Sequence, residues 1–183
     1  MNKEFEDVLE KDEQIIWSEK PNKKRFYWSI FFSYLFSSFF AGMWVPLMFV
    51  GMAIEKEATW TSVWIALGAF LGFIVLAISI SMLIGDAIYK KTFYAISNKR
   101  ILIRTGFIGV DYKMMELKLM GATSVKVGLL DKILKQDTGI VRFGSPSAQM
   151  MGANGVSSTY RFAGVTKPYE VSKLVRKAVE EAK

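Results

Sequence analysis

Residues that could do acid–base or nucleophilic chemistry are few in this chain, because its 183 residues include neither histidine nor cysteine. Thiol nucleophiles, histidine bases and histidine- or cysteine-based metal sites are therefore excluded. Ser145 and Ser147 have no histidine to activate them. Carboxylates remain in the C-terminal half, but no motif links them: Asp111, Glu116, Asp131 and Asp137. We expect no enzyme activity, no metal site and no cofactor.

Basic residues are the second group that could bind a partner, and they gather in the C-terminal half. Residues 89–183 carry seventeen Lys or Arg against seven Asp or Glu, and the whole chain has a net charge of +7. Near an anionic leaflet each such residue contributes about 1 kcal/mol of attraction. Five lie close to the end of an apolar stretch and are candidate lipid-head-group contacts: Lys90, Lys91, Lys99, Arg100 and Arg104. The alternative is ordinary charge beside a membrane and along solvated strand edges.

Other features with a functional interpretation are less specific. Gly106 and Gly109 do not form a phosphate loop, because neither a Lys-Ser/Thr pair nor a helix follows them. Aromatic residues do not interleave with the basic ones, so no nucleic acid is expected as a partner. The stretch 144–158 is rich in Gly, Ser, Ala and Met, and Met150 and Met151 could adapt to a partner protein. The alternative is a mobile loop.

Two apolar stretches, residues 26–54 and 60–85, contain no Asp, Glu, Lys or Arg. Roughly 20 apolar residues cross about 30 Å of hydrocarbon. Buried helices of a soluble protein are the alternative, but neither stretch has a polar face. Only a short linker separates the two, so we predict a transmembrane helical hairpin over residues 26–87, whose first helix Pro46 kinks.

Flanking charge predicts the orientation of this hairpin. Lys20, Lys23, Lys24 and Arg25 precede the first span, and Lys90 and Lys91 follow the second, whereas the linker has one lysine. The positive-inside rule therefore places both termini in the cytoplasm. The acidic, amphipathic residues 1–25 lack the basic start of a signal peptide, so we treat them as a separate cytoplasmic segment.

Small residues predict a helix-packing seam in the hairpin. Ser29, Ser33, Ser37 and Ala41 recur every four residues on the first helix, and Gly68 and Gly72 form a GxxxG pattern on the second. Such residues let helix backbones approach closely in lipid. The candidate seam is Ser33, Ser37, Ala41, Gly68 and Gly72, with Ala41 opposite Gly72. The same residues could instead mediate oligomerisation.

From Lys90 onward, short alternating runs replace the solid apolar ones and predict antiparallel strands. The predicted strands are residues 92–97, 100–105, 112–119, 123–127, 140–143 and 160–163, with a tight turn at Asn98-Lys99 and a helical turn near 129–134. A terminal amphipathic helix follows, with Thr166 as its cap and Pro168 in its first turn. The order of strands and helix indicates an α+β domain over residues 88–183.

Three stretches resemble the bacterial pleckstrin-homology-like family, often called the membrane-flanked domain. Residues 12–21 (DEQIIWSEKP) are similar to the family's segment before the first span. Residues 94–101 (YAISNKRI), followed by Gly106, resemble its first hairpin, and residues 162–171 (FAGVTKPYEV) resemble its last strand and the start of its helix.

The resemblance implies a small, strongly bent antiparallel β-barrel closed by the C-terminal helix, and no enzyme activity. It also implies the bacterial inner membrane as the location. We expect a membrane-anchored PH-like module that binds a protein partner or a second copy of itself at the inner leaflet. The alternative is a domain that binds or senses anionic lipid.

Overall fold

A computed structural model describes residues 3–55, 59–144 and 160–182 of the chain. The chain forms two compact units, one made of Met1–Phe26 with Ala87–Lys183 and the other of Tyr27–Asp86. We call the first the domain and the second the hairpin. The domain therefore includes the N-terminal segment that the sequence analysis sets apart as residues 1–25.

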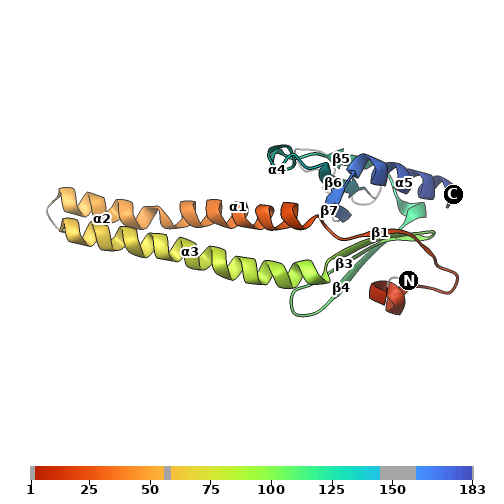
Figure 1. Ribbon diagram of the computed structural model, residues 1–183, viewed down its shortest axis with the longest axis horizontal. Coiled ribbons are helices and arrows are strands. Elements are labelled where there is room, and N and C mark those ends of the chain that lie inside the picture. Colours follow the sequence, from red (N-terminus) through yellow and green to blue (C-terminus); the bar gives the residue numbers. More distant parts are fainter. Residues whose placement is uncertain (1–2, 56–58, 145–159, 183) are drawn as a thin grey trace. The chain divides into compact units, whose positions relative to one another are not determined.

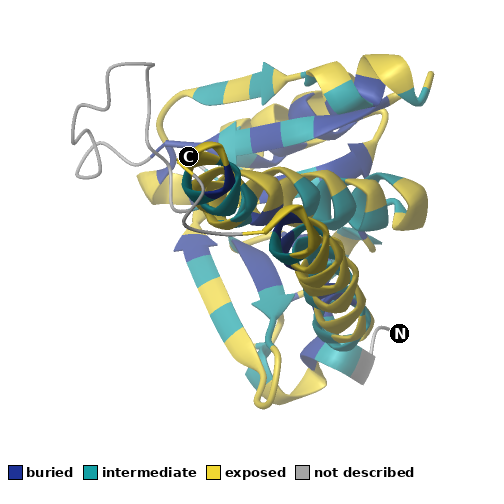
Figure 2. Ribbon diagram, turned by 90° about the vertical axis from the view of Figure 1, so that its left-hand side faces the viewer, coloured by how far each residue is buried: buried dark blue, intermediate teal, exposed yellow. Residues whose placement is uncertain are grey.

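The hairpin consists of α1 (Lys23–Gly42), α2 (Trp44–Ile54) and α3 (Trp60–Lys91), whose outer ends belong to the domain. Two helical stretches, Lys23–Ile54 and Trp60–Lys91, are long and apolar enough to cross a membrane. Most of their residues are exposed or half-buried (Figure 2). The first stretch is interrupted at Met43, as predicted, because Pro46 has no N–H to donate to the carbonyl of Gly42.

A four-stranded antiparallel sheet contains β1 (Ile15–Glu19), β2 (Phe93–Ser97), β3 (Arg100–Thr105) and β4 (Asp111–Glu116), in that order (Figure 1). Both strands of the predicted hairpin are present, and β3 has the predicted bounds. The strand β1 was not predicted from the sequence, because its partner β2 lies beyond the whole hairpin in the chain.

A short 3-10 helix, η1 (Lys3–Val8), precedes β1 and packs on one face of this sheet. Phe5 is completely buried there against Ala95 and Leu102. The apolar side chains of the amphipathic N-terminal segment thus cover one face of the sheet. Burial of a phenylalanine side chain stabilises that packing by about 2 to 3 kcal/mol.

The second sheet has three antiparallel strands, β5 (Thr123–Lys126), β6 (Thr138–Phe143) and β7 (Tyr160–Thr166). The short helix α4 (Leu129–Ile133) lies between β5 and β6, where a helical turn was predicted. The last helix, α5 (Pro168–Glu181), begins at Pro168 as predicted. Thr166 does not cap it: Lys167 occupies the N-cap with φ of 49°, and its side chain makes no capping hydrogen bond.

One apolar core joins the two sheets and α5. Ile96, Ile101 and Leu117 are fully buried from the first sheet and its 3-10 extension η2 (Leu117–Leu119), and Phe162 and Val175 from the second sheet and α5. Aromatic rings fill its centre, with Phe162 stacked 4.8 Å from Tyr94 and 5.7 Å from Trp17, measured between ring centroids.

The predicted closed barrel is not found among the described strands, which form two separate sheets. The ladder stops because the run predicted as one strand over 112–119 turns into η2 after Glu116. Beyond that turn the chain pairs elsewhere: the N–H of Gly121 donates to the carbonyl of Gly144 over 2.7 Å, which extends the second sheet. The fold is α+β, with two packed antiparallel sheets.

Candidate functional site

The five basic residues proposed as lipid contacts fall into two groups at opposite ends of the first sheet. In the β2–β3 pairing, Arg104 lies opposite Phe93, which follows Lys90 and Lys91, the last two residues of α3. Lys99 and Arg100 lie at the turn after Ser97. A five-residue strand spans about 17 Å. We call the end at Lys91 the proximal end, because α1 begins and α3 ends there, and the turn end the distal end.

At the distal end, Arg100 forms an ion pair with Glu13, which we call the distal ion pair. The Nη2 of Arg100 lies 2.8 Å from Oε2 of Glu13, and its Nε donates to both carboxylate oxygens at 3.0 and 3.2 Å. Ser97 Oγ donates to Glu13 over 2.6 Å, and Arg100 also donates to the carbonyl of Val8 over 2.7 Å. The Glu13 side chain has no exposed surface.

Burial acts to raise the pKa of the Glu13 carboxyl, but hydrogen bonds from Arg100, the Glu10 N–H and Ser97 outweigh it. The pKa of Glu13 therefore lies below its ordinary value. The hydrogen bond to Glu13 raises the pKa of Arg100 in turn. A carboxylate that accepts several hydrogen bonds favours its charged form.

Lys99 is also engaged at the distal end. Its Nζ lies 3.2 Å from Oε2 of Glu10 and 3.2 Å from the carbonyl of Lys11. Both distal cations thus neutralise carboxylates of the N-terminal segment. Sequence reasoning missed Glu13 because 87 positions separate it from Arg100, and no local pattern links the two.

The proximal end holds Lys91 and Arg104 in a different environment. The Lys91 ammonium donates to the carbonyls of Phe107, Ile108 and Gly109 over 2.7, 2.8 and 3.3 Å. The Arg104 guanidinium carbon lies 5.5 Å from the centroid of the Phe93 ring. Its Nε is buried, and among the described residues it has no hydrogen-bond partner.

Lys20 joins this group through the same ring. Its Nζ lies 4.3 Å from the Phe93 centroid and 5.9 Å from that of Tyr89. A cation this close to an aromatic face gains about 0.5–1 kcal/mol at an exposed site. Two positive charges, those of Lys20 and Arg104, therefore lie around the Phe93 ring, close to the end of α3.

A second buried carboxylate lies at the proximal end, where Asp131 and Arg25 form the proximal ion pair. The Nε of Arg25 lies 2.6 Å from Oδ1 of Asp131, which also accepts a 2.6 Å hydrogen bond from the hydroxyl of Thr138. Oδ2 of Asp131 accepts the N–H of Gly128 over 2.8 Å. Asp131 is completely buried, so these bonds hold α4 against the first turn of α1.

The other carboxylates considered for catalysis are exposed: Asp111, Glu116 and Asp137. Within the described ranges, no group of three acidic residues could hold a metal ion. Asp131, the fourth carboxylate of that set, is occupied by Arg25 and Thr138. The serines and methionines of the 145–158 stretch, including Ser145, Ser147, Met150 and Met151, lie outside the described residues.

The two long helices of the hairpin come close together at two glycines that are not the predicted pair, Gly42 and Gly85. A Cβ on Gly85 would lie 2.5 Å from Cδ1 of Ile30, and one on Gly42 would lie 2.5 Å from the Phe70 ring. A Cβ on Gly68 or Gly72 would meet no atom within 4 Å among the described residues. The close approaches therefore lie elsewhere than at Gly68 and Gly72, and the predicted seam, within the hairpin or between copies of the chain, stays a prediction.

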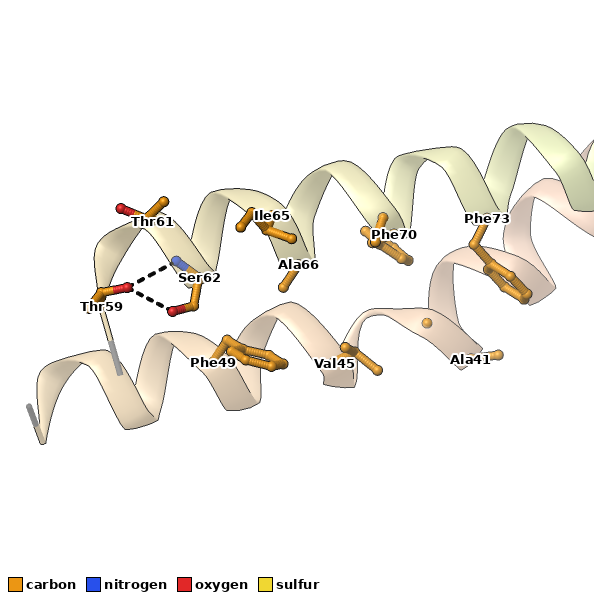
Figure 3. A pocket seen from close by; sticks show the side chains of 12 residues that line it. Ala41, Val45, Phe49, Thr59, Thr61, Ser62, Ile65, Ala66, Phe70 and Phe73 are labelled. Atoms are coloured by element: carbon orange, nitrogen blue, oxygen red, sulfur yellow. Dashed lines mark hydrogen bonds between the residues drawn. The ribbon is translucent and has the colours of Figure 1, made fainter. Parts of the chain in front are cut away.

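Ala41 instead lines an open groove of about 660 Å³ between the α1–α2 stretch and α3 (Figure 3). Phe49, Phe70 and Phe73 contribute its aromatic surface, and the hydroxyls of Thr59 and Ser62 bond to each other at one end. A second groove, on α1, is lined by Ser33 and Ser37 among phenylalanines. Both surfaces are apolar, as expected of helices that face hydrocarbon.

The chain matches the model of the bacterial PH domain family over residues 48–179. This match includes α3, all strands after the hairpin and most of α5. Neither a curated protein nor a solved structure is significantly similar to the chain. Because the family match extends over more than half of the sequence, the chain belongs to the bacterial PH domain family.

Proposed function

We propose that this protein is a non-catalytic PH-like interaction module, anchored in the bacterial inner membrane by its helical hairpin. Its domain lies at the cytoplasmic leaflet and binds a protein partner there, which can be a second copy of the chain. Two apolar helices, a PH-family domain and a basic proximal end support this proposal.

Pairing of β1 with β2 supports the two-span topology. Residue Glu19 lies opposite Tyr94, four residues before α1 and three after α3. Both ends of the hairpin must therefore lie on the same side of any membrane that it enters. Lysines and arginines flank both ends, and the positive-inside rule then favours the cytoplasmic side.

The observation that carries the interaction proposal is the open edge of the first sheet. Within the described ranges, β4 has β3 as its strand partner on one side and no strand on the other. Edge strands present unpaired N–H and C=O groups to which an extended segment of another protein can bond. Lys113 is exposed in the middle of this edge, and the strand has neither a proline nor an irregularity in its pairing.

Photo-crosslinking in intact membranes tests this proposal. A photoreactive amino acid at Lys113 should give a discrete protein adduct, whereas one at Lys173, exposed on α5, serves as the control. Backbone N–H groups alternate along β4 between the side that faces β3 and the outer side, so those of Asp111 and Met114 point to opposite sides. The photoreactive residue stays at Lys113, and proline is placed in turn at Asp111 and Met114. The proline that blocks an outward N–H should abolish the adduct and leave the unfolding temperature nearly unchanged.

Two results would contradict the interaction module. One is a protein that runs as a strict monomer in native-size measurements and gives no adduct at Lys113. The other is an adduct pattern that is identical at Lys113 and Lys173, because that would indicate random collision in the membrane.

Anionic-lipid binding is the second candidate, favoured by the two cations around Phe93. An excised fragment from residue 88 would lack β1, so the full chain in nanodiscs is the suitable sample. We expect native mass spectrometry to detect anionic lipid retained by the protein and less retention by Arg104→Gln. Equal retention of anionic and zwitterionic lipid would contradict this candidate, and a difference that vanishes in high salt would indicate surface attraction without a pocket.

A further inference from the structure

We propose that two apolar tips of the domain insert into the head-group region of the bilayer and seat the domain on the leaflet from which the hairpin emerges. The first, the Phe107 tip, is the β3–β4 connection with Phe107, Ile108 and Val110. The second, the α4 tip, consists of Leu129 and Ile133. This inference rests on the membrane anchoring proposed above, but not on the protein partner.

The Phe107 tip is tied to the residue at which α3 ends. Lys91, the last residue of α3, donates hydrogen bonds to three successive carbonyls of the connection. Ile108 nevertheless exposes 87% of its surface, and Phe107 exposes 46%. A helix that leaves a membrane at Lys91 therefore places this apolar loop at the depth of its own last turn.

The loop has a defined shape that presents these side chains outward. A Cβ on Gly106 would lie 2.3 Å from the carbonyl oxygen of Gly109, so the turn closes only with glycine at this position. The ammonium of Lys91 satisfies carbonyls that the turn leaves without strand partners. These carbonyls therefore have a hydrogen-bond donor, which every backbone carbonyl needs in apolar surroundings.

The α4 tip is tied in the same way to the other span. The proximal ion pair joins Asp131, in the middle of α4, to Arg25, the third residue of α1. Leu129 and Ile133 precede and follow Asp131 by two residues and expose 79% and 69% of their surfaces. Residues four apart lie on the same face of a helix, so the two side chains form one apolar surface.

Charge around the two tips fits the lipid surface better than a protein interior. Lys20, Lys23, Lys24 and Lys90 are exposed near the two helix ends, and Lys132 lies exposed on α4 itself. Apolar side chains with a surrounding band of lysine and arginine are typical of segments that lie in the membrane interface. The two helix ends are neighbours, with the Phe26 and Tyr89 rings 5.3 Å apart, so both tips flank one membrane entry point.

Depth-dependent fluorescence quenching tests this inference in the full chain. The sequence has no cysteine, so a single cysteine can be introduced at Ile108 or at Leu129 and labelled with an environment-sensitive dye. The protein is reconstituted in bilayers that carry a nitroxide near the head group. We expect a blue shift and strong quenching at both positions.

Matched controls come from the distal end and from the hairpin. Leu119 and Ile16 are also apolar and expose 60% and 50% of their surfaces. Both lie at the distal end, Ile16 beside Ser97 and Leu119 two residues after Leu117, which bonds to Lys99, so no quenching is expected there. Leu76, in the middle of α3 and 60% exposed, should be quenched by a nitroxide deep in the acyl chains.

Each outcome decides between the alternatives. Quenching of Ile108 and Leu129 without quenching of Leu119 and Ile16 supports the inference. Unquenched tips together with a quenched Leu76 overturn it and leave the membrane anchoring intact. A blue shift at the tips without quenching also overturns it, because a protein surface then covers them. An unquenched Leu76 overturns the anchoring and the inference together.

Discussion

The two ends of the domain hold the N-terminal segment in the same way but differ in their exposed surfaces. Each end binds the N-terminal segment through a buried carboxylate paired with an arginine: Glu13 with Arg100 at the distal end, and Asp131 with Arg25 at the proximal end. At the distal end Lys99 also faces a carboxylate. At the proximal end lysines and apolar side chains stay exposed.

This difference teaches that position along the chain is a poor guide to charge at a membrane surface. Lys91 is the last residue of α3, and Lys99 follows it by only eight residues. In the structure, β2 lies between the two lysines, so Lys99 is at the distal end of the sheet. Its ammonium donates there to Glu10 and to the carbonyl of Lys11. Lys91 and Arg104, at the proximal end, instead contact backbone carbonyls and an aromatic ring.

The largest expected effect is at the proximal ion pair. Asp131→Ala leaves Arg25 without its partner and removes acceptors from Thr138 and Gly128, so we expect a loss of about 4 kcal/mol in the free energy of unfolding. Denaturant unfolding of the full chain in detergent measures it. The control is Asp137→Ala, an exposed carboxylate that should change stability by less than about 0.5 kcal/mol. Equal effects of the two variants would contradict the assigned role.

Breaking the distal ion pair should have the next largest effect. Glu13→Ala leaves Arg100 mostly buried without its main partner, which costs about 3 kcal/mol. Glu10→Ala is the matched control, because Glu10 is exposed and its ion pairs contribute less than about 1 kcal/mol. A Glu13 variant as stable as the Glu10 variant would show that the N-terminal segment is held by packing of Phe5 alone.

The dependence of stability on pH tests the distal ion pair in a second way. Because the folded-state pKa of Glu13 lies below its unfolded value of about 4.3, its contribution is fully present above that value and is lost as pH falls through the folded pKa. Thermal unfolding between neutral and acid pH should thus show a smaller loss for Glu13→Gln than for the unchanged protein. Parallel curves for the two proteins would contradict the lowered pKa.

The smallest expected effect compares single lysines at the two ends. Lys20→Gln removes a charge near the membrane entry and should weaken attraction to anionic lipid by about 1 kcal/mol. Lys99→Gln, which already faces Glu10, should leave that attraction unchanged. Retention of anionic lipid by the two variants in nanodiscs, at low and high salt, measures the difference. A greater loss for Lys99→Gln would reverse the comparison of the two ends.

Local patterns predicted the elements of this chain well, and distant pairings poorly. The apolar runs at 26–54 and 60–85 gave the long helices, Pro46 gave the break at Met43, and alternation gave β3 with its bounds. The strand β1 escaped because its partner lies beyond the hairpin. The two ion pairs escaped for the same reason, since each joins residues 87 or more positions apart.

The closed barrel is not found among the described strands, and the close approaches of α3 lie at glycines other than Gly68 and Gly72, for a different reason. The alternation of apolar and polar residues continues through Leu117 and Leu119, although the backbone turns there. A 3-10 turn can bury Leu117 just as a strand would, so the pattern does not distinguish the two. Gly68 and Gly72 fit a packing pattern, but α3 turns Gly85 toward Ile30 instead. Composition alone does not give the rotation of a helix about its axis.

The pairing of β1 with β2 also sets an order of events during synthesis. The ribosome makes β1 first, but its neighbour β2 becomes available only after the second long helix has been translated. Until then Trp17 and Phe5 have no completed sheet to cover. A nascent chain that has not yet completed this sheet keeps these aromatic residues exposed, and such transiently exposed apolar surface is prone to aggregation.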